Sequence, residues 1–595
     1  MTRRPGRAGP AGSQGSRGLR GLRGPWGPAA AASAGTAGLI AIAASIACTF
    51  AVAVAGPSVM EPVLPGRPGS PPWSLGLHPS PYLAAGLTAA GLAAGTLGLV
   101  LVLRAIRGGW SVPARAVLVA GLLAAVALTL VPPFGSSDHL SYAAYGRMLV
   151  TGHNPYTTTP AQLAAAGDPV ARAVQDWSGS PSVYGPLATA IQALASLAGG
   201  TSVRLTVFVL GLANLAAFAV TALLLHRMTR HHPAQQLRAA LLWAANPLLL
   251  QVLVAGAHVD GQAVVFGVAA VSCVIPISPG GAPPPVTPPL TGGLHPPVPP
   301  WPPDDGGILR VSVRRWAVAG VLVGLGFAVK VTIALVGLGL AIALVLLLGR
   351  GWRRLVPRLA ALGTGFAVTA GAAVAIGGPA MLRQSSRASD MVSIGSPWRV
   401  IRTVIQLAVT GTPATDIVKA GAIALAVVLA VLLIRGLPRP ATWAELSAGP
   451  DAGAFAFAGV TFALALAWLF AWPYVLPWYD ALAWALLPLV PLGPGTAVEG
   501  LSWLLIARTA ALGFGYLPAR QTDAALPPGL GWLQPVVRHG VTPAVLAAAT
   551  VWLVILMVPR GGQPGRMVRQ DLPPAPSSCA PPARPSEAPA RRAVN

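Results

Sequence analysis

The stretch SSDHLSYAAYGRMLVTGHNPY, residues 136–156, gathers acidic, basic and aromatic side chains directly after a long apolar run. Its acid, Asp138, is of the type that takes a proton from an attacking hydroxyl in group-transfer reactions. A second interpretation stays open, because a carboxylate at the start of a helix also stabilises the helix dipole by about 0.3–1 kcal/mol. The tyrosines fit either a substrate-binding surface or the aromatic belt of a membrane protein.

The residues around Asp138 predict how it is held. Ser136 and Ser137 can cap a helix whose first turn contains Asp138 and which ends at Gly152. We expect this helix to be amphipathic and to lie at a membrane surface. By helical spacing, one of its faces carries the acid and three large side chains, namely Asp138, Tyr142, Tyr145 and Leu149.

The composition indicates a membrane protein. The chain has 595 residues, of which 54% are hydrophobic and only 9% charged, whereas a soluble protein usually has about 25% charged residues. A net charge of +24 could point to nucleic acid. However, the arginines lie in tails and short loops, where orientation in a membrane explains them. Cys48, Cys273 and Cys579 are far apart, so they predict neither a disulfide framework nor a metal cluster.

Apolar windows of membrane-spanning length recur along the chain. They predict an all-α polytopic membrane protein with about 12–14 transmembrane helices. We expect spans near residues 33–55, 82–104, 114–133, 203–225, 238–256, 261–277, 316–329, 331–349, 357–377, 416–434, 453–471, 476–494, 499–517 and 541–558.

Arginines in alternate loops predict the orientation of these spans. The loops after residues 104, 227, 310, 350 and 435 each hold two or more arginines, which is typical of cytoplasmic loops. Both termini are then cytoplasmic, in a multi-pass protein of the plasma membrane. Residues 134–202 form a large outer loop, and residues 378–415 form another.

Three segments are predicted to lie outside the transmembrane core of residues 31–558. Residues 1–30 and 559–595 are basic, Pro-rich tails that we expect to be disordered and cytoplasmic. Residues 276–303 contain thirteen prolines, which predicts an irregular cytoplasmic loop over 276–310. Residues 316–349 are too long for one span and have arginines at both ends, so we expect a tight hairpin with Lys330 near its outer turn.

Further residues at predicted outer span ends are candidates for substrate contacts. Lys330 is an ionisable group next to a span, which is costly and needs a reason, although a lysine reaching towards water remains an alternative. Arg387 and Arg399 lie in an outer loop, against the trend of the other arginines, and suit phosphate binding. His258 and Asp260 could bind sugar hydroxyls or simply begin a helix. Aromatic residues near Trp478 could stack on sugars or form a membrane belt.

These residues occur in motifs that resemble a known family. The motifs are DHLSYAAYGRML (138–149), GHNPY (152–156), VYGPL (183–187), GAHVDG (256–261), FAVK (327–330) and LPWYDALAWAL (476–486). In kind and order they are similar to those of the polyprenol-phosphomannose-dependent α-1,6-mannosyltransferases of actinobacterial cell envelopes. The similarity extends over residues 130–490. This chain departs from the family at Val259, where the motif has Asn.

The resemblance implies a GT-C glycosyltransferase fold with its catalytic acid in the first outer loop. The implied donor is polyprenyl-phosphate mannose. The implied acceptor is a glycolipid or an α-1,6-mannan of lipomannan or lipoarabinomannan type, and the reaction takes place at the outer face of the membrane. The enzyme would be a hexosyltransferase that contacts lipid bilayer and no nucleic acid.

The chemistry of such a transfer assigns roles to the candidates. An inverting transfer needs one general base, which we assign to Asp138. Cations must neutralise the leaving phosphate, and we assign Lys330, Arg387 and Arg399 to the donor phosphate. The predicted substrate-binding residues are Tyr142, Tyr145, Arg147, Asn154, Tyr156, Tyr184, His258, Asp260, Trp478, Tyr479 and Asp480.

No cofactor is predicted. The sequence has no phosphate-binding glycine loop of the nucleotide-binding type, which agrees with a lipid-linked donor. It also has no Asp-x-Asp metal motif, so a divalent metal is not indicated. The alternative function is a transporter or flippase of polyprenyl-linked glycans, which would predict an internal repeat and polar residues at mid-membrane. The polar residues cluster instead at outer span ends, which favours an enzyme.

Overall fold

The computed structural model describes residues 27–275, 311–349, 351–409, 411–437, 452–490, 497–519 and 526–558. The regular secondary structure of these residues is helical, and they contain no strand. Eight of their helices are long and apolar enough to cross a membrane, which confirms the prediction of an all-α polytopic membrane protein. The contacts described below lie within the compact unit that ends at Met557.

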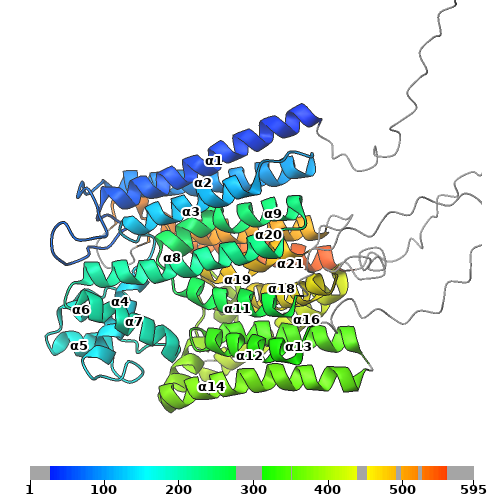
Figure 1. Ribbon diagram of the computed structural model, residues 1–595. Coiled ribbons are helices and arrows are strands. Elements are labelled where there is room, and N and C mark those ends of the chain that lie inside the picture. Colours follow the sequence, from blue (N-terminus) through cyan, green and yellow to red (C-terminus); the bar gives the residue numbers. More distant parts are fainter. Residues whose placement is uncertain are drawn as a thin grey trace, which may run out of the picture. The chain divides into compact units, whose positions relative to one another are not determined.

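Most predicted spans correspond to a single helix (Figure 1). These helices are α1 (Pro28–Ala55), α2 (Pro81–Arg107), α3 (Ala114–Leu130), α8 (Val203–Met228), α11 (Asp260–Val274), α12 (Val313–Phe327), α13 (Ala334–Leu348), α14 (Trp352–Ser389), α16 (Thr412–Gly436), α18 (Ala452–Ala471), α20 (Ala497–Gly515) and α21 (Thr542–Met557). The hairpin predicted for residues 316–349 is confirmed, because the chain leaves α12 at Phe327 and re-enters a helix after Lys330.

Two predicted segments differ from the structure. The span expected at 476–494 breaks into the short helices η6 (Pro477–Asp480), α19 (Ala481–Leu486) and η7 (Leu487–Leu489). Prolines, which lack a backbone N–H, occupy the first position of η6 (Pro477) and the second position of η7 (Pro488). Part of the outer loop expected at 378–415 is helical, since α14 continues beyond the kink at Gly378 and is followed by α15 (Pro397–Ile405).

One apolar segment forms the centre of the bundle. In the apolar 18-residue window of residues 233–255, 94% of the residues are buried, whereas the corresponding share in the other seven candidate spans is between 22% and 44%. The segment consists of α9 (Pro233–Ala239), η2 (Ala240–Ala244), α10 (Pro247–Leu249) and η3 (Leu250–Ala255). Its neighbours approach closely where they present small residues. A β-carbon on Gly121 of α3 would lie 2.4 Å from the carbonyl oxygen of Ala244, which is the small-residue packing typical of membrane helices.

The loop of residues 134–202 folds into a helical cap at one end of the bundle (Figure 1). It contains α4 (Asp138–Val150), α5 (Pro160–Ala165), α6 (Pro169–Arg172) and α7 (Pro186–Gly199). Helix α4 packs on α6, α7 and α8, and nine of its thirteen residues are buried. The predicted helix is therefore confirmed, but these neighbours enclose it more fully than expected for an amphipathic surface helix.

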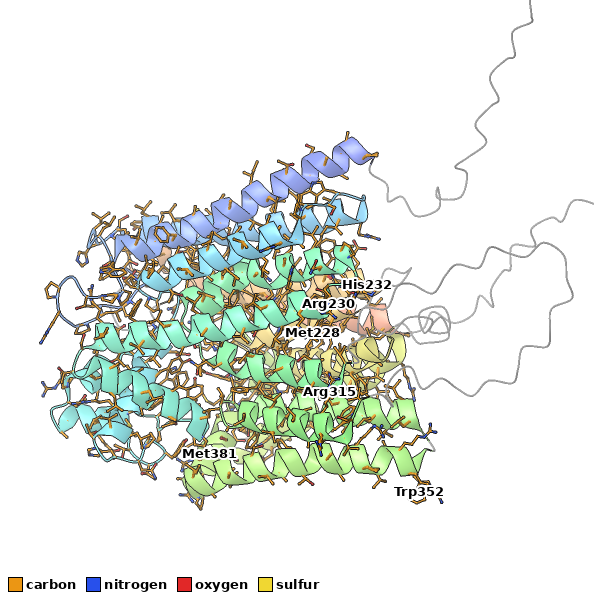
Figure 2. The ribbon with its side chains drawn as sticks, in the orientation of Figure 1. Met228, Arg230, His232, Arg315, Trp352 and Met381 are labelled. Carbon is orange, nitrogen blue, oxygen red and sulfur yellow. The ribbon has the colours of Figure 1, made fainter. Side chains whose placement is uncertain are left out.

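A group of arginines lies at one end of the bundle. Figure 2 shows Arg230, Arg315 and Trp352 at one end, whereas Met381 lies at the other, next to the helical cap. Arg104 and Arg107 complete the last turn of α2, whose C-terminal end lies on the side of α9, away from the cap (Figure 1). The predictions for the tails and for the Pro-rich loop fall on 1–26, 276–310 and 559–595, which lie outside the described residues.

Close contact between α4 and α7 generates a stability prediction. A β-carbon on Gly146 would lie 2.1 Å from the carbonyl oxygen of Gln192 on α7. Gly146→Ala should therefore force the helices apart and lower the free energy of unfolding by about 1–3 kcal/mol. Thermal unfolding of the purified protein measures the change.

Gly86→Ala is the matched control for this variant, because a β-carbon there meets no atom within 4 Å and alanine favours the helix. A melting temperature of Gly146→Ala equal to that of Gly86→Ala would contradict the packing argument.

Candidate functional site

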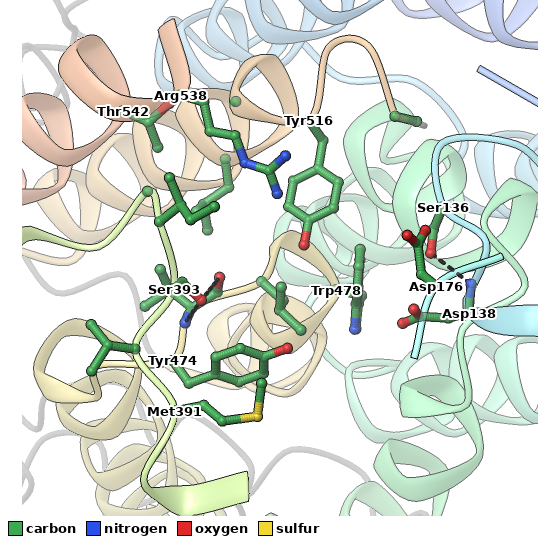
Figure 3. Close-up of a pocket in the computed structure, with 18 of the residues that line it drawn as sticks. Ser136, Asp138, Asp176, Met391, Ser393, Tyr474, Trp478, Tyr516, Arg538 and Thr542 are labelled. Atoms are coloured by element: carbon green, nitrogen blue, oxygen red, sulfur yellow. Dashed lines mark hydrogen bonds between the residues drawn. The ribbon is translucent and has the colours of Figure 1, made fainter. Parts of the chain in front are cut away.

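A cavity of about 330 Å³ opens beside the N-terminus of α4 (Figure 3). Several chain segments far apart in the sequence form its walls. One wall carries two acids, Asp138 and Asp176, and the opposite side carries Arg538. The remaining lining comes from residues 391–395, 474–478 and 512–519, with Thr542.

Asp138 begins α4 and faces this cavity. The hydroxyl of Ser136 accepts a hydrogen bond of 3.1 Å from the Asp138 N–H, so Ser136 rather than Ser137 satisfies the helix start. Backbone bonds fix the preceding loop, since Phe134 N–H donates to Ala255 O (3.0 Å) and Gly135 N–H donates to Met60 O (2.7 Å). The side chain of Asp138 remains 16% exposed.

His258 and Trp478 form a stacked pair beside the Asp138 carboxylate. Nδ1 of His258 lies 3.7 Å from Oδ2 of Asp138, and the His258 ring stacks on Trp478 with centroids 3.5 Å apart. Tyr142 contributes its hydroxyl, which lies 3.4 Å from the same Nδ1 and accepts a bond from the Tyr184 hydroxyl. Ala257 turns the chain sharply before His258, with a φ of 52°.

Burial sets the protonation of this group. It raises the pKa of the Asp138 carboxyl to about 7, an effect to which the neighbouring charge of Asp176 adds and which Lys330 opposes. Burial also lowers the pKa of His258 well below its ordinary value, so the imidazole is neutral. A carboxyl with a pKa near 7 beside a neutral ring is suited to accept a proton from a hydroxyl.

The predicted phosphate-binding cations lie elsewhere. Lys330 forms a 2.6 Å ion pair with Asp260, and its Nζ lies 3.7 Å from the ring centroid of Tyr479. This cluster borders a separate, much smaller space. Arg387 and Arg399 are exposed residues that do not line the cavity. None of these three cations lines the cavity, although Lys330 lies near enough to Asp138 to lower its pKa. Their role at the phosphate stays a prediction.

Arg538 is the basic residue that the cavity does contain, among the residues the structure describes. It comes from η9 (Leu533–Val541), and its guanidinium carbon lies 5.1 Å from the ring centroid of Tyr516. Tyr516 in turn packs edge-on against Trp478. A continuous row of side chains thus connects Arg538 to His258 and Asp138. Sequence reasoning missed Arg538, although a cation beside the last predicted span was a usable signal.

The remaining predicted substrate residues have structural contacts. Arg147 donates to Asp168 (2.7 Å), and Asn154 accepts from the Tyr156 N–H. Buried Asp480 receives hydrogen bonds from Arg508 (2.8 Å) and Thr509 (2.7 Å). Of all the predicted site residues, only Asp138 and Trp478 line the cavity. The residues placed outside it are Tyr142, Tyr145, Arg147, Asn154, Tyr156, Tyr184, His258, Asp260, Tyr479 and Asp480.

Asp176 and Trp177 are two cavity residues that the sequence prediction did not include. An acid followed by Trp in a Ser- and Gly-rich stretch of the same loop as Asp138 was the available signal. Within the described ranges, no three His, Cys, Asp or Glu side chains gather in an arrangement that could hold a metal ion.

A family model described as "Alpha-(1->6)-mannopyranosyltransferase, N-terminal domain" matches residues 32–348. This chain belongs to that family. The match includes α4, Asp138, Asp176 and His258, whereas the cavity residues after 390 lie beyond it.

Two curated proteins of Corynebacterium glutamicum are similar to part of the chain. Alpha-(1->6)-mannopyranosyltransferase A is 29% identical over 133 residues, which are 22% of this chain and 27% of that protein. Alpha-(1->6)-mannopyranosyltransferase B is 29% identical over 132 residues, 22% of each protein. The matched part is thus about a quarter of the length of these relatives. No solved structure matches the chain.

The environment of Asp138 generates a prediction about its titration. The carboxyl should be protonated below pH 7 and should ionise as the pH rises through about 7. Asp176→Asn removes a negative charge that raises this pKa, so the midpoint should move to lower pH. Infrared difference spectra of the full-length protein against Asp138→Asn measure the carboxyl band.

Asp390→Asn is the control for this titration, because Asp390 is paired with Lys419 outside the cavity. A midpoint that stays in place or rises in Asp176→Asn would show that the two carboxylates do not interact.

Proposed function

We propose that this protein is an integral membrane α-1,6-mannosyltransferase that uses polyprenyl-phosphate mannose as donor. The acceptor is an α-1,6-mannan of lipomannan or lipoarabinomannan type, and transfer occurs at the outer face of the plasma membrane. Membership of the mannopyranosyltransferase family supports the reaction. The observation that carries the proposal is a single cavity with carboxylates on one side and Arg538 on the other (Figure 3).

This arrangement matches the charges of the reaction. The acceptor hydroxyl attacks C1 of the mannose from the face opposite the phosphate, and Asp138 accepts the hydroxyl proton. The bond between C1 and the phosphate oxygen breaks, and its electron pair stays on that oxygen. Arg538 neutralises the charge that develops on the leaving polyprenyl phosphate. A β-linked donor then gives an α-linked product by inversion.

The positions of the arginines support the proposed orientation. Arg230 and Arg315 lie at the end of the bundle away from the helical cap (Figure 2). Basic residues favour the cytoplasmic side. The helical cap and Asp138 are then on the extracytoplasmic side, where a lipid-linked donor would carry its sugar. Nothing in this scheme requires a metal ion, since one carboxylate and one cation supply the charges.

Asp138→Asn tests the base assignment. The amide keeps the shape of the side chain but cannot accept the proton, so transfer should fall by about 10²–10⁴. The measurement is incorporation of labelled mannose from polyprenyl-phosphate mannose into mannan by membranes that contain equal amounts of each protein. Loss of a helix-dipole contact alone would cost only about 0.3–1 kcal/mol of stability. More than about a third of wild-type turnover in Asp138→Asn would refute this role.

Arg538→Gln tests the phosphate assignment. Loss of a charged donor to the leaving group should lower kcat/KM for the lipid donor by about 10²–10³. Arg538→Lys should recover part of this loss, because lysine keeps the charge but not the two-pronged geometry. Arg353→Gln, an exposed arginine on α14, is the matched control. If Arg387→Ala or Arg399→Ala loses more activity than Arg538→Gln, the sequence-based assignment is the correct one.

A further inference from the structure

Trp177 has an unusual backbone conformation. Its φ is 64°, in the left-handed region that bulky residues rarely adopt. Such a conformation costs on the order of 1–3 kcal/mol and persists only where surrounding contacts impose it. Residues of this kind concentrate at functional sites.

Three side chains from one face of α4 hold the turn that contains Trp177. The hydroxyl of Ser137 donates to the Asp176 carboxylate, and Ser141 Oγ donates to the Asp176 carbonyl oxygen (3.2 Å). The Tyr145 hydroxyl donates to the carbonyl oxygen of Ser180 (3.0 Å). Residues 137, 141 and 145 are spaced by one helical turn each. The helix that begins with Asp138 therefore also fixes the position of Trp177.

This turn is closed by the backbone as well. Ser180 N–H donates to Trp177 O (2.9 Å), and Ala161 N–H donates to Ser178 O (2.8 Å). The conformation of Trp177 is thus imposed from α4, from its own turn and from α5. A side chain with only a packing role would not require these constraints, because a relaxed backbone can bury an indole equally well.

The indole lies where a substrate would meet it. Trp177 lines the cavity beside Asp138 and Asp176 and is 43% exposed, whereas the other cavity tryptophan, Trp478, is only 4% exposed. The Trp177 side chain also lies close enough to the Asp138 carboxyl to lower its pKa. The indole N–H is a donor only, so it is the group through which Trp177 acts on the carboxylate, and the exposed part of the ring remains free.

We propose that Trp177 is the acceptor-binding platform of the site: its ring stacks on the acceptor pyranose, and its N–H positions the Asp138 carboxylate. This inference rests on the proposed function. The face of an aromatic ring is negative and attracts the partly positive C–H groups of a sugar face. A sugar on this ring has one hydroxyl near Asp138 and a neighbouring hydroxyl within reach of Asp176.

The position of Arg538 distinguishes the acceptor from the donor. The leaving phosphate belongs on the Arg538 side of the cavity, whereas the attacking hydroxyl must approach the base (Figure 3). Trp177 and Asp176 lie on the base side. The platform therefore binds the sugar that attacks and not the sugar that is transferred.

Two variants separate the two roles of Trp177. Trp177→Phe keeps an aromatic face but removes the N–H. Trp177→Gly removes the ring and relieves the backbone, because glycine adopts positive φ readily, so it should fold at least as well as the wild type. Trp352→Ala is the matched control, as Trp352 is an exposed tryptophan at the opposite end of the bundle (Figure 2). All proteins are full-length and reconstituted in nanodiscs with polyprenyl-phosphate mannose and an α-1,6-mannobiose acceptor.

Trp177→Gly should raise the KM for the acceptor about ten-fold, the effect of losing an aromatic contact, and leave the KM for the donor unchanged. Trp177→Phe should keep the acceptor KM within about threefold. In the wild type the Trp177 N–H lowers the pKa of Asp138. Without it this pKa rises, so the pH profile of Trp177→Phe should shift to higher pH. A wild-type acceptor KM in Trp177→Gly overturns the platform, and an unshifted pH profile in Trp177→Phe overturns the positioning role.

A different result would contradict the proposed function. If the wild-type protein transfers no mannose from this donor, the function is wrong. Binding of α-1,6-mannobiose, followed by calorimetry, then tests the platform without turnover. Equal binding by the wild type and Trp177→Gly would reject it, and binding lost only in Trp177→Gly would support it.

Discussion

The proposed site depends on a carboxylate, Asp138, that can accept a proton although it is largely buried. As the base of the proposed transfer, Asp138 needs a pKa that burial raises, yet burial also disfavours the charged form that accepts the proton. The cavity meets both requirements. Burial raises the pKa of the Asp138 carboxyl to about 7, and the charge of Asp176 adds to this effect. The adjacent His258 is neutral, and the Asp138 N–H donates a hydrogen bond to the Ser136 hydroxyl, which fixes the start of the helix. A protonated imidazole at 3.7 Å would instead lower the pKa and weaken the base.

The helices that deliver these groups follow from the same constraint. Backbone groups inside a bilayer must be paired, so irregular segments occur where protein covers them. The loops before Asp138 and before His258 are joined to each other by the bond from Phe134 to Ala255, at the end of the most buried segment of the bundle. Gly121 lets α3 approach this centre, and Gly146 lets α4 pack closely against α7. Asp138 is thus held by the rigid core and not by a free loop.

The sequence predicted those features of the site that depend only on neighbouring residues in the chain. Apolar windows gave the helices, and the capping serines with the acid after them gave the start of α4. The break at Lys330 followed from a run too long for one span. The break at Pro477 and Pro488 was missed because an apolar composition dominates the hydropathy of that segment, although the prolines were visible. The helical stretch after Gly378 was missed because charged residues there resemble a loop.

The pairing of charges across the bundle could not be predicted in this way. Lys330 and Arg538 are both cations near apolar helices, and no local feature distinguishes them. In the structure Lys330 is held by Asp260 under the ring of Tyr479, whereas Arg538 reaches the cavity from a segment four hundred residues after Asp138. The two cations differ in the side chains that they contact after folding. Lys330 still influences Asp138 by lowering its pKa. The Asp260–Lys330 pair therefore acts on the Asp138 carboxyl through space, because neutralising Lys330 would raise the pKa of Asp138 without changing any contact in the cavity.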